Sequence, residues 1–88
     1  MYRVQTVVRC DSGLNGKQAT DFVQKANTFH SSIWLECGSK RMNAKSLLGL
    51  MSLCIGTGAS VTLIADGVDE QEAVEALRLL LMTGNGEQ

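Results

Sequence analysis

Asn43-Ala44-Lys45-Ser46-Leu47-Leu48-Gly49-Leu50-Met51-Ser52-Leu53 is the central stretch of this 88-residue chain, and the other segments can be placed around it. It carries no charge after Lys45, and its short apolar run predicts a helix of one to two turns. Ser46 is expected at the N-cap of this helix, because a serine hydroxyl accepts one of the unpaired backbone N–H groups of the first turn.

Two interpretations of Ser46 are open from the residues alone. In the first, Ser46 only caps the helix. In the second, a phosphate on Ser46 lies at the positive end of the helix dipole near Lys45 and places up to about two negative charges beside an apolar patch. We expect Leu50 and Leu53 to face the core. The patch is then formed by residues that are at least partly exposed: Leu47, Leu48 and Met51.

Composition limits the classes of function. Hydrophobic residues make up 44% of the chain, which predicts one globular domain over residues 1–88. The net charge is -1 and no basic stripe is visible, which argues against direct binding to nucleic acid. We expect no signal peptide, and the longest apolar run, Leu79–Met82, is far too short to span a membrane. We therefore expect a cytoplasmic protein.

Cysteine and histidine usage predicts no metal site and no cofactor. Cys10, Cys37 and Cys54 form no Cys-x-x-Cys pair, and His30 is the only histidine. Three reduced thiols in the cytoplasm are the simplest interpretation. His30 is expected to cap the C-terminal end of the first helix, where a cation interacts favourably with the helix dipole.

Four segments alternate between apolar and polar residues and predict strands: residues 2–8, 32–37, 40–43 and 60–66. Gly38-Ser39 predicts a tight turn between the second and third strands. Val61, Leu63 and Ala65 share one face of the last strand. Trp34 is expected on the outward face of its strand, either covered by a neighbour or available to a partner.

Two longer segments have helical periodicity. The first helix is expected to open at Asn15 and to run to about Phe29, and the last helix is expected to begin with a capping box of Asp69 and Glu72. Their apolar stripes contain Ala19, Phe22, Val23 and Ala26 in the first helix, and Ala73, Leu77, Leu80 and Leu81 in the last. Strands and helices in this order predict an α+β domain of two layers.

Two motifs resemble HPr, the small phosphocarrier of the bacterial sugar phosphotransferase system. They are Ser12-Gly13-Leu14-x-x-x-x-Ala19-Thr20 and the central stretch 43–53, which is similar to the regulatory segment of HPr proteins from low-GC Gram-positive bacteria. The resemblance covers nearly the whole chain. It implies an open-faced β-sandwich, with a four-stranded antiparallel sheet covered on one side by three helices.

The chain departs from the HPr pattern at the phosphoryl-accepting histidine. Asn15 stands at that position, and Gly16-Lys17-Gln18 replaces the Ala-Arg-Pro of the family. An amide lacks the nucleophilic nitrogen of an imidazole, so we expect no phosphocarrier chemistry and no enzymatic activity. Asn15 is interpreted as a helix cap in a retired active site, or alternatively as a partner contact.

A lost histidine beside a retained serine resembles one branch of the family, the catabolite-repression HPr-like proteins (Crh). An independently degraded HPr is the alternative. The Crh resemblance implies phosphorylation of Ser46 by HPr kinase/phosphorylase and a corepressor role for a catabolite-control LacI-family regulator. A docking module that modulates an enzyme without phosphorylation is a second hypothesis, and a carrier that works through another residue, such as His30, is a third. The residues expected to contact partners are Asn15, Lys17, Lys45, Leu47, Leu48 and Met51.

Overall fold

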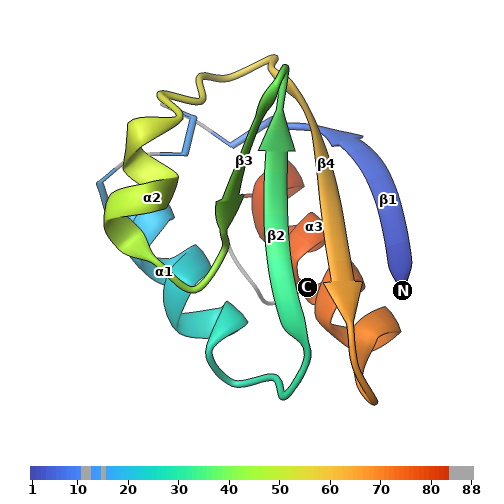
Figure 1. Cartoon of the computed structure of the whole chain (residues 1–88). Helices are drawn as coiled ribbons and strands as arrows, with labels where there is room; N and C mark the ends of the chain where they lie inside the picture. The colour runs from blue at the N-terminus through green and yellow to red at the C-terminus, as the bar shows by residue number, and fades with distance from the viewer. Residues whose placement is uncertain (11–12, 15, 84–88) are drawn as a thin grey trace.

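The computed structural model describes residues 1–10, 13, 14 and 16–83 (Figure 1). Strands and helices follow one another in the predicted order, with small differences at their ends. Their bounds are β1 Tyr2–Val7, α1 Lys17–Ala26, β2 Ser32–Cys37, β3 Lys40–Asn43, α2 Leu47–Ser52, β4 Ser60–Asp66 and α3 Glu70–Thr83.

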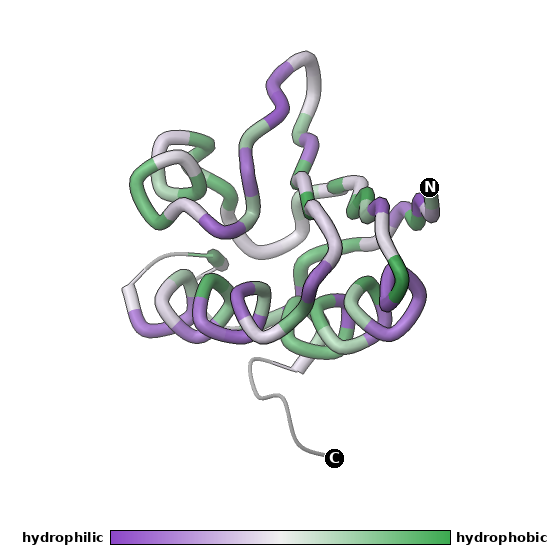
Figure 2. The backbone as a smooth tube through the Cα atoms, turned by 60° about the horizontal axis from the view of Figure 1, so that its bottom comes forward, coloured by the Kyte–Doolittle hydropathy of each residue, from purple (hydrophilic) through white to green (hydrophobic). Residues whose placement is uncertain are grey.

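The strands form one antiparallel sheet in the order β1-β4-β2-β3. The β2–β3 hairpin turns at Gly38, whose φ of 64° matches the predicted tight turn. Figures 1 and 2 show the three helices on one side of the sheet, while its other face is left open. The expected open-faced β-sandwich is therefore confirmed.

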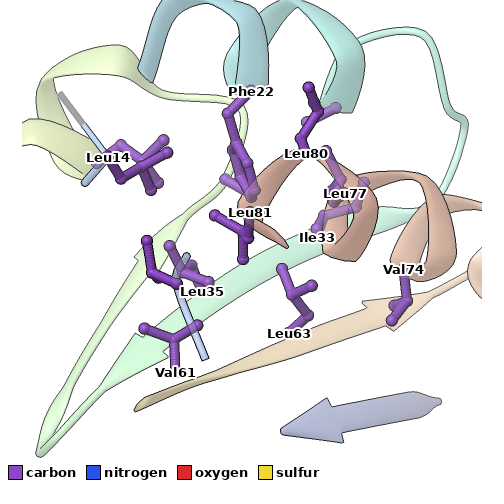
Figure 3. Packing of buried hydrophobic residues seen from close by; sticks show 14 of the residues in the cluster. Leu14, Phe22, Ile33, Leu35, Val61, Leu63, Val74, Leu77, Leu80 and Leu81 are labelled. Atoms are coloured by element: carbon purple, nitrogen blue, oxygen red, sulfur yellow. The ribbon is translucent and has the colours of Figure 1, made fainter. Parts of the chain in front are cut away.

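The core lies between the sheet and the helices (Figure 3). Leu35 and Leu63 project from β2 and β4 towards Phe22 of α1 and Leu77 and Leu81 of α3, and all five side chains are fully buried. Full burial of one such side chain contributes about 1.5–3 kcal/mol. The predicted stripes of both long helices and the inward face of β4 are thus correct.

One side chain on the outer face of the sheet is buried, although the alternation of inward and outward residues along a strand does not predict it. Ile64 occupies an outward position on β4, opposite Arg3 of β1 and Trp34 of β2, yet its exposed fraction is 0%. The guanidinium carbon of Arg41 lies 5.8 Å from the Trp34 ring centroid, within the range of a cation–π contact. Arg41 also pairs with Glu36 at 2.8 Å. Trp34 is half-buried, with Arg41 as one covering neighbour.

The junction between β4 and α3 differs from the predicted capping box. The Asp69 carboxylate accepts hydrogen bonds from the backbone N–H groups of His30 and Ser31, at 2.8 and 2.9 Å, and from the Ser31 hydroxyl. The expected partnership of Asp69 with Glu72 is therefore wrong. Glu70 instead accepts from the backbone N–H of Gly67 at 3.1 Å.

The first helix ends earlier than expected. α1 ends at Ala26 with Asn27 as its C-cap, rather than at Phe29, so His30 lies beyond the helix and does not cap it. Its backbone is held by Asp69 of a distant segment. A contact across 39 positions leaves no periodic signal in the sequence, which is why this joint was missed.

Asp69 should make the stability of the fold sensitive to acid. The Ser31 hydroxyl and then the His30 N–H lower the pKa of Asp69 from 3.8 to about 2. A carboxyl group with a lowered folded-state pKa stabilises the fold above its unfolded pKa, and this contribution is lost as the pH falls from 3.8 towards 2. The urea midpoint of Asp69→Asn should therefore be lower than that of wild type at pH 7, and the two midpoints should converge near pH 2.

Glu72→Gln provides the matched control for this measurement. It removes a carboxylate from the first turn of the same helix without removing the hydrogen bonds to His30 and Ser31. The urea midpoint of this variant should follow the wild-type pH dependence. A constant difference between Asp69→Asn and wild type at every pH would contradict the assignment to Asp69.

Candidate functional site: a capping serine beside an apolar patch

Ser46 lies at the N-cap of α2, as predicted. Its backbone is extended, with φ −112° and ψ 114°, and its Oγ accepts a hydrogen bond from the Gly49 N–H at 3.2 Å. Its carbonyl accepts the first helical hydrogen bond, from Leu50 N at 3.0 Å. The side chain is half-buried. The hydroxyl is therefore fixed in place by the start of the helix.

The apolar residues of α2 separate into two faces, as expected. Leu50 is fully buried and Leu53 is half-buried. Figure 2 shows the hydrophobic colouring of α2, which stands apart from α1 and α3 in that view. The α2 patch consists of the large apolar residues of this helix that remain exposed: Leu47 at 37%, Leu48 at 84% and Met51 at 45%. An apolar group of this kind beside a polar serine is typical of a protein interaction surface.

The two lysines assigned to partner binding already have intramolecular contacts. The Lys17 ammonium lies 2.6 Å from an Asp21 carboxylate oxygen, one turn along α1. The Lys45 ammonium donates to the backbone carbonyl of Phe29 at 2.8 Å. Lys17 is thus neutralised by a carboxylate, whereas Lys45 is bound to an uncharged acceptor.

The entrance to α1 is partly outside the described residues. Asn15, expected as a cap or a partner contact, is one of the residues that the structure does not describe. The helix begins at Lys17, and its cap position is Gly16, with φ 55°, rather than Asn15. The Gly16 carbonyl accepts from the Thr20 hydroxyl at 3.1 Å.

Hydrogen bonds join the segment before α1 to the segment after α2. Leu14 N donates to the Ile55 carbonyl at 2.9 Å, and the Thr57 hydroxyl donates to the Cys10 carbonyl at 2.8 Å. These two contacts hold the segment just before α1 against the segment that follows α2.

The described residues contain no cluster of three or more histidine, cysteine or acidic side chains that could hold a metal ion. Cys10 is buried, Cys37 is half-buried and Cys54 is exposed. Within the same part of the chain, no helix is both long enough and apolar enough to cross a membrane.

Comparison with known proteins identifies the family. Residues 2–83 match the family described as PTS HPr component phosphorylation site. The HPr-like protein Crh of Halalkalibacterium halodurans is 52% identical over 77 residues, which cover 88% of this chain and 92% of the relative. Crh of Bacillus subtilis is 52% identical over the same length and is covered to 91%. The chain belongs to the HPr family.

Solved structures agree with this assignment. HPr-C-His from Thermoanaerobacter tengcongensis has a TM-score of 0.93 and 42% identity, with 100% of this chain and 99% of that chain covered. The selenomethionyl Crh of Bacillus subtilis, described as a dimer with a swapped domain, has a TM-score of 0.71 and 49% identity, with 93% of each chain covered. The fold matches an HPr structure closely, although the identity to Crh is higher.

Proposed function

We propose that this chain is a non-catalytic regulatory protein built as one HPr-like domain over residues 1–88. HPr kinase/phosphorylase transfers the terminal phosphoryl group of ATP to Ser46 Oγ, the hydroxyl proton passes to a base of the kinase, and ADP leaves. The phosphorylated protein then acts in the cytoplasm as corepressor for a catabolite-control LacI-family regulator. Similarity to two Crh proteins supports this role.

One observation carries the proposal: Ser46 and the exposed α2 patch are adjacent, while the phosphoryl-accepting histidine is replaced by Asn15. A phosphate on Ser46 adds up to about two negative charges and three acceptor oxygens at the rim of that patch. A partner with a basic group beside an apolar pocket then gains charge-assisted hydrogen bonds that the unmodified protein cannot offer. Leu47, Leu48 and Met51 supply the apolar contact.

Intact-mass measurement after two separate incubations tests the phosphorylation. With HPr kinase/phosphorylase and ATP, wild type should gain one phosphoryl group and Ser46→Ala should gain none. Ser52→Ala, at the other end of α2, is the matched serine control and should still gain one. With enzyme I and phosphoenolpyruvate, no mass should be added, because Asn15 lacks a nucleophilic nitrogen. Uptake from enzyme I would contradict the non-carrier role.

Binding to the regulator tests the second half of the proposal. We expect the phosphorylated protein to bind at least about tenfold more tightly than the unmodified one, because several charge-assisted hydrogen bonds are added. Titration by calorimetry at two ionic strengths measures this ratio. The ratio should fall at high salt, since the gain is electrostatic.

A second candidate function is a docking module that modulates an enzyme without phosphorylation. The observation that favours it is the exposure of Leu48, 84% in the unmodified protein, which needs no switch to become available. Equal partner affinity before and after phosphorylation would support this alternative over the corepressor role.

A further inference from the structure

The turn that precedes Ser46 is attached to the end of α1. The Lys45 ammonium donates to the Phe29 carbonyl at 2.8 Å, in a partly buried contact across 16 positions. The Asn27 amide donates to the Val23 carbonyl at 2.9 Å and also lies 3.5 Å from the Lys45 carbonyl. Two groups at the C-terminal end of α1 therefore contact both the side chain and the backbone of Lys45.

The backbone on each side of Lys45 is also fixed. Asn43 accepts from Lys45 N at 2.8 Å through its side chain and from Ser46 N at 3.1 Å through its carbonyl. Ala44 N donates to the Ile33 carbonyl of β2 at 2.9 Å. The chain thus enters the Ser46 cap from a turn that is bound to the sheet on one side and to α1 on the other.

The carbonyl that holds the Lys45 ammonium is itself part of a fixed segment. Phe29 is half-buried and packs against the core, and its N–H donates to the Ala26 carbonyl at 3.3 Å. The next two residues, His30 and Ser31, are held by Asp69. Lys45 therefore connects the Ser46 turn to a segment that is itself held by the core and by Asp69.

Lys45 differs in its contact from Lys17 of α1 and Arg78 of α3. Lys17 and Arg78 each pair with a carboxylate, of Asp21 and Glu75 respectively, whereas the hydrogen bond found for the Lys45 ammonium goes to a neutral carbonyl. Lys45 is half-buried, and its flexible stem reaches the end of α1. Its contact serves to join two segments rather than to balance a charge.

We infer that Lys45 is a positioning residue for Ser46: by binding the Phe29 carbonyl it holds the hydroxyl where a kinase can phosphorylate it. This inference rests on the proposed phosphorylation. Transfer to a hydroxyl requires the reacting atoms about 3–3.5 Å apart, and a displacement of about 1 Å can cost about a hundredfold in rate. Without the Lys45 contact, the turn samples more positions and fewer of them are productive.

The test compares Lys45→Met, Lys45→Arg and Lys40→Met with wild type. Methionine keeps the apolar stem and removes the donor, while arginine keeps a cationic donor. Lys40 is exposed on β3, so its replacement removes an equal charge without touching the Ser46 turn. The first measurement is amide hydrogen exchange of Gly49, whose N–H donates a hydrogen bond to Ser46 Oγ. The second is steady-state phosphorylation by HPr kinase/phosphorylase and ATP.

Lys45→Met alone should accelerate Gly49 exchange and lower kcat about tenfold with KM nearly unchanged, because misplacement of the acceptor slows the chemical step. Lys45→Arg should restore most of the rate. A raised KM with unchanged kcat in Lys45→Met would overturn the inference, since it would make Lys45 a docking contact. An equal loss in Lys40→Met would overturn it as well, because charge alone would then explain the effect.

The kinetic and exchange measurements separate this inference from the proposed function. If wild type accepts no phosphate, the proposed function fails, and Gly49 exchange in the unmodified variants still decides whether Lys45 holds the Ser46 cap. Unchanged Gly49 exchange in Lys45→Met would overturn the inference. Faster exchange with unchanged phosphorylation kinetics would overturn it too, because the contact would then be structural only.

Discussion

Gly13→Ala should destabilise the fold by about 3–5 kcal/mol, the largest effect that we expect of a single methyl group in this chain. Gly13 has φ 68°, and a Cβ at this position would lie 2.5 Å from the Ile55 carbonyl oxygen and 2.6 Å from Gly56 Cα. Both are backbone atoms, so no side-chain rotation can relieve the overlap. The methyl group must separate the segment before α1 from the segment that follows α2.

Gly38→Ala is the matched control, because it has nearly the same backbone conformation and no neighbour. Its φ is 64°, and a Cβ there would meet nothing within 4 Å. This variant should cost only the left-handed backbone penalty, about 1–2 kcal/mol. Urea unfolding at pH 7 followed by circular dichroism measures both variants. If Gly13→Ala is too unstable to purify, a lower yield of folded protein than for Gly38→Ala shows that it is the more destabilised variant. Equal stabilities of the two variants would contradict the close approach of Gly13 to the backbone of Ile55 and Gly56.

Ile64→Ala should cost about 2–4 kcal/mol, although alternation along β4 places this side chain on the open face of the sheet. Its exposed fraction is 0%, while Val7, on the outward face of β1, is 37% exposed. Removing buried methyl and methylene groups loses their transfer free energy and leaves a cavity under the side chains above. Val7→Ala removes methyl groups from the same face of the sheet at an exposed position, and it should cost less than about 1 kcal/mol.

The cost at Ile64 should depend on Trp34, its direct neighbour across β2 and β4. In Trp34→Ala, part of the cover is already removed, so Ile64→Ala should cost less than in wild type. A double-mutant cycle from urea unfolding should give a coupling free energy of about 0.5–3 kcal/mol. Additive costs, or a change below about 0.5 kcal/mol for Ile64→Ala alone, would show that the outer face is open to solvent at this position.

The local chemistry of the chain made much of the candidate site predictable. The N-cap at Ser46 was predictable because a serine before an apolar run is a strong local signal. Its partner, the Gly49 N–H, is only three positions away. The division of α2 into buried Leu50 and exposed Leu48 follows from helical spacing on a short helix over a sheet. These features depend on neighbours within one turn.

The contacts of the charged residues were not predictable in the same way. The contact of Lys45 with Phe29 was not predicted. Asp69 was expected to pair with Glu72, but it binds the backbone of residues 30 and 31. A charged side chain can bind any acceptor or donor that the fold brings within reach. Its partner is therefore set by segments that are distant in the sequence.

The order of strands and helices, the inward stripes of Phe22, Leu63 and Leu77, and the N-cap at Ser46 could all be predicted from the residues, because periodicity and capping act within a few positions. Three features follow from the packing of distant segments: the burial of Ile64 on the open face, the contact of Asp69 with the residues just before β2, and the contact of Lys45 with the segment that follows α1. Each of these depends on strand order and helix packing, which bring together residues from 16 to 61 positions apart.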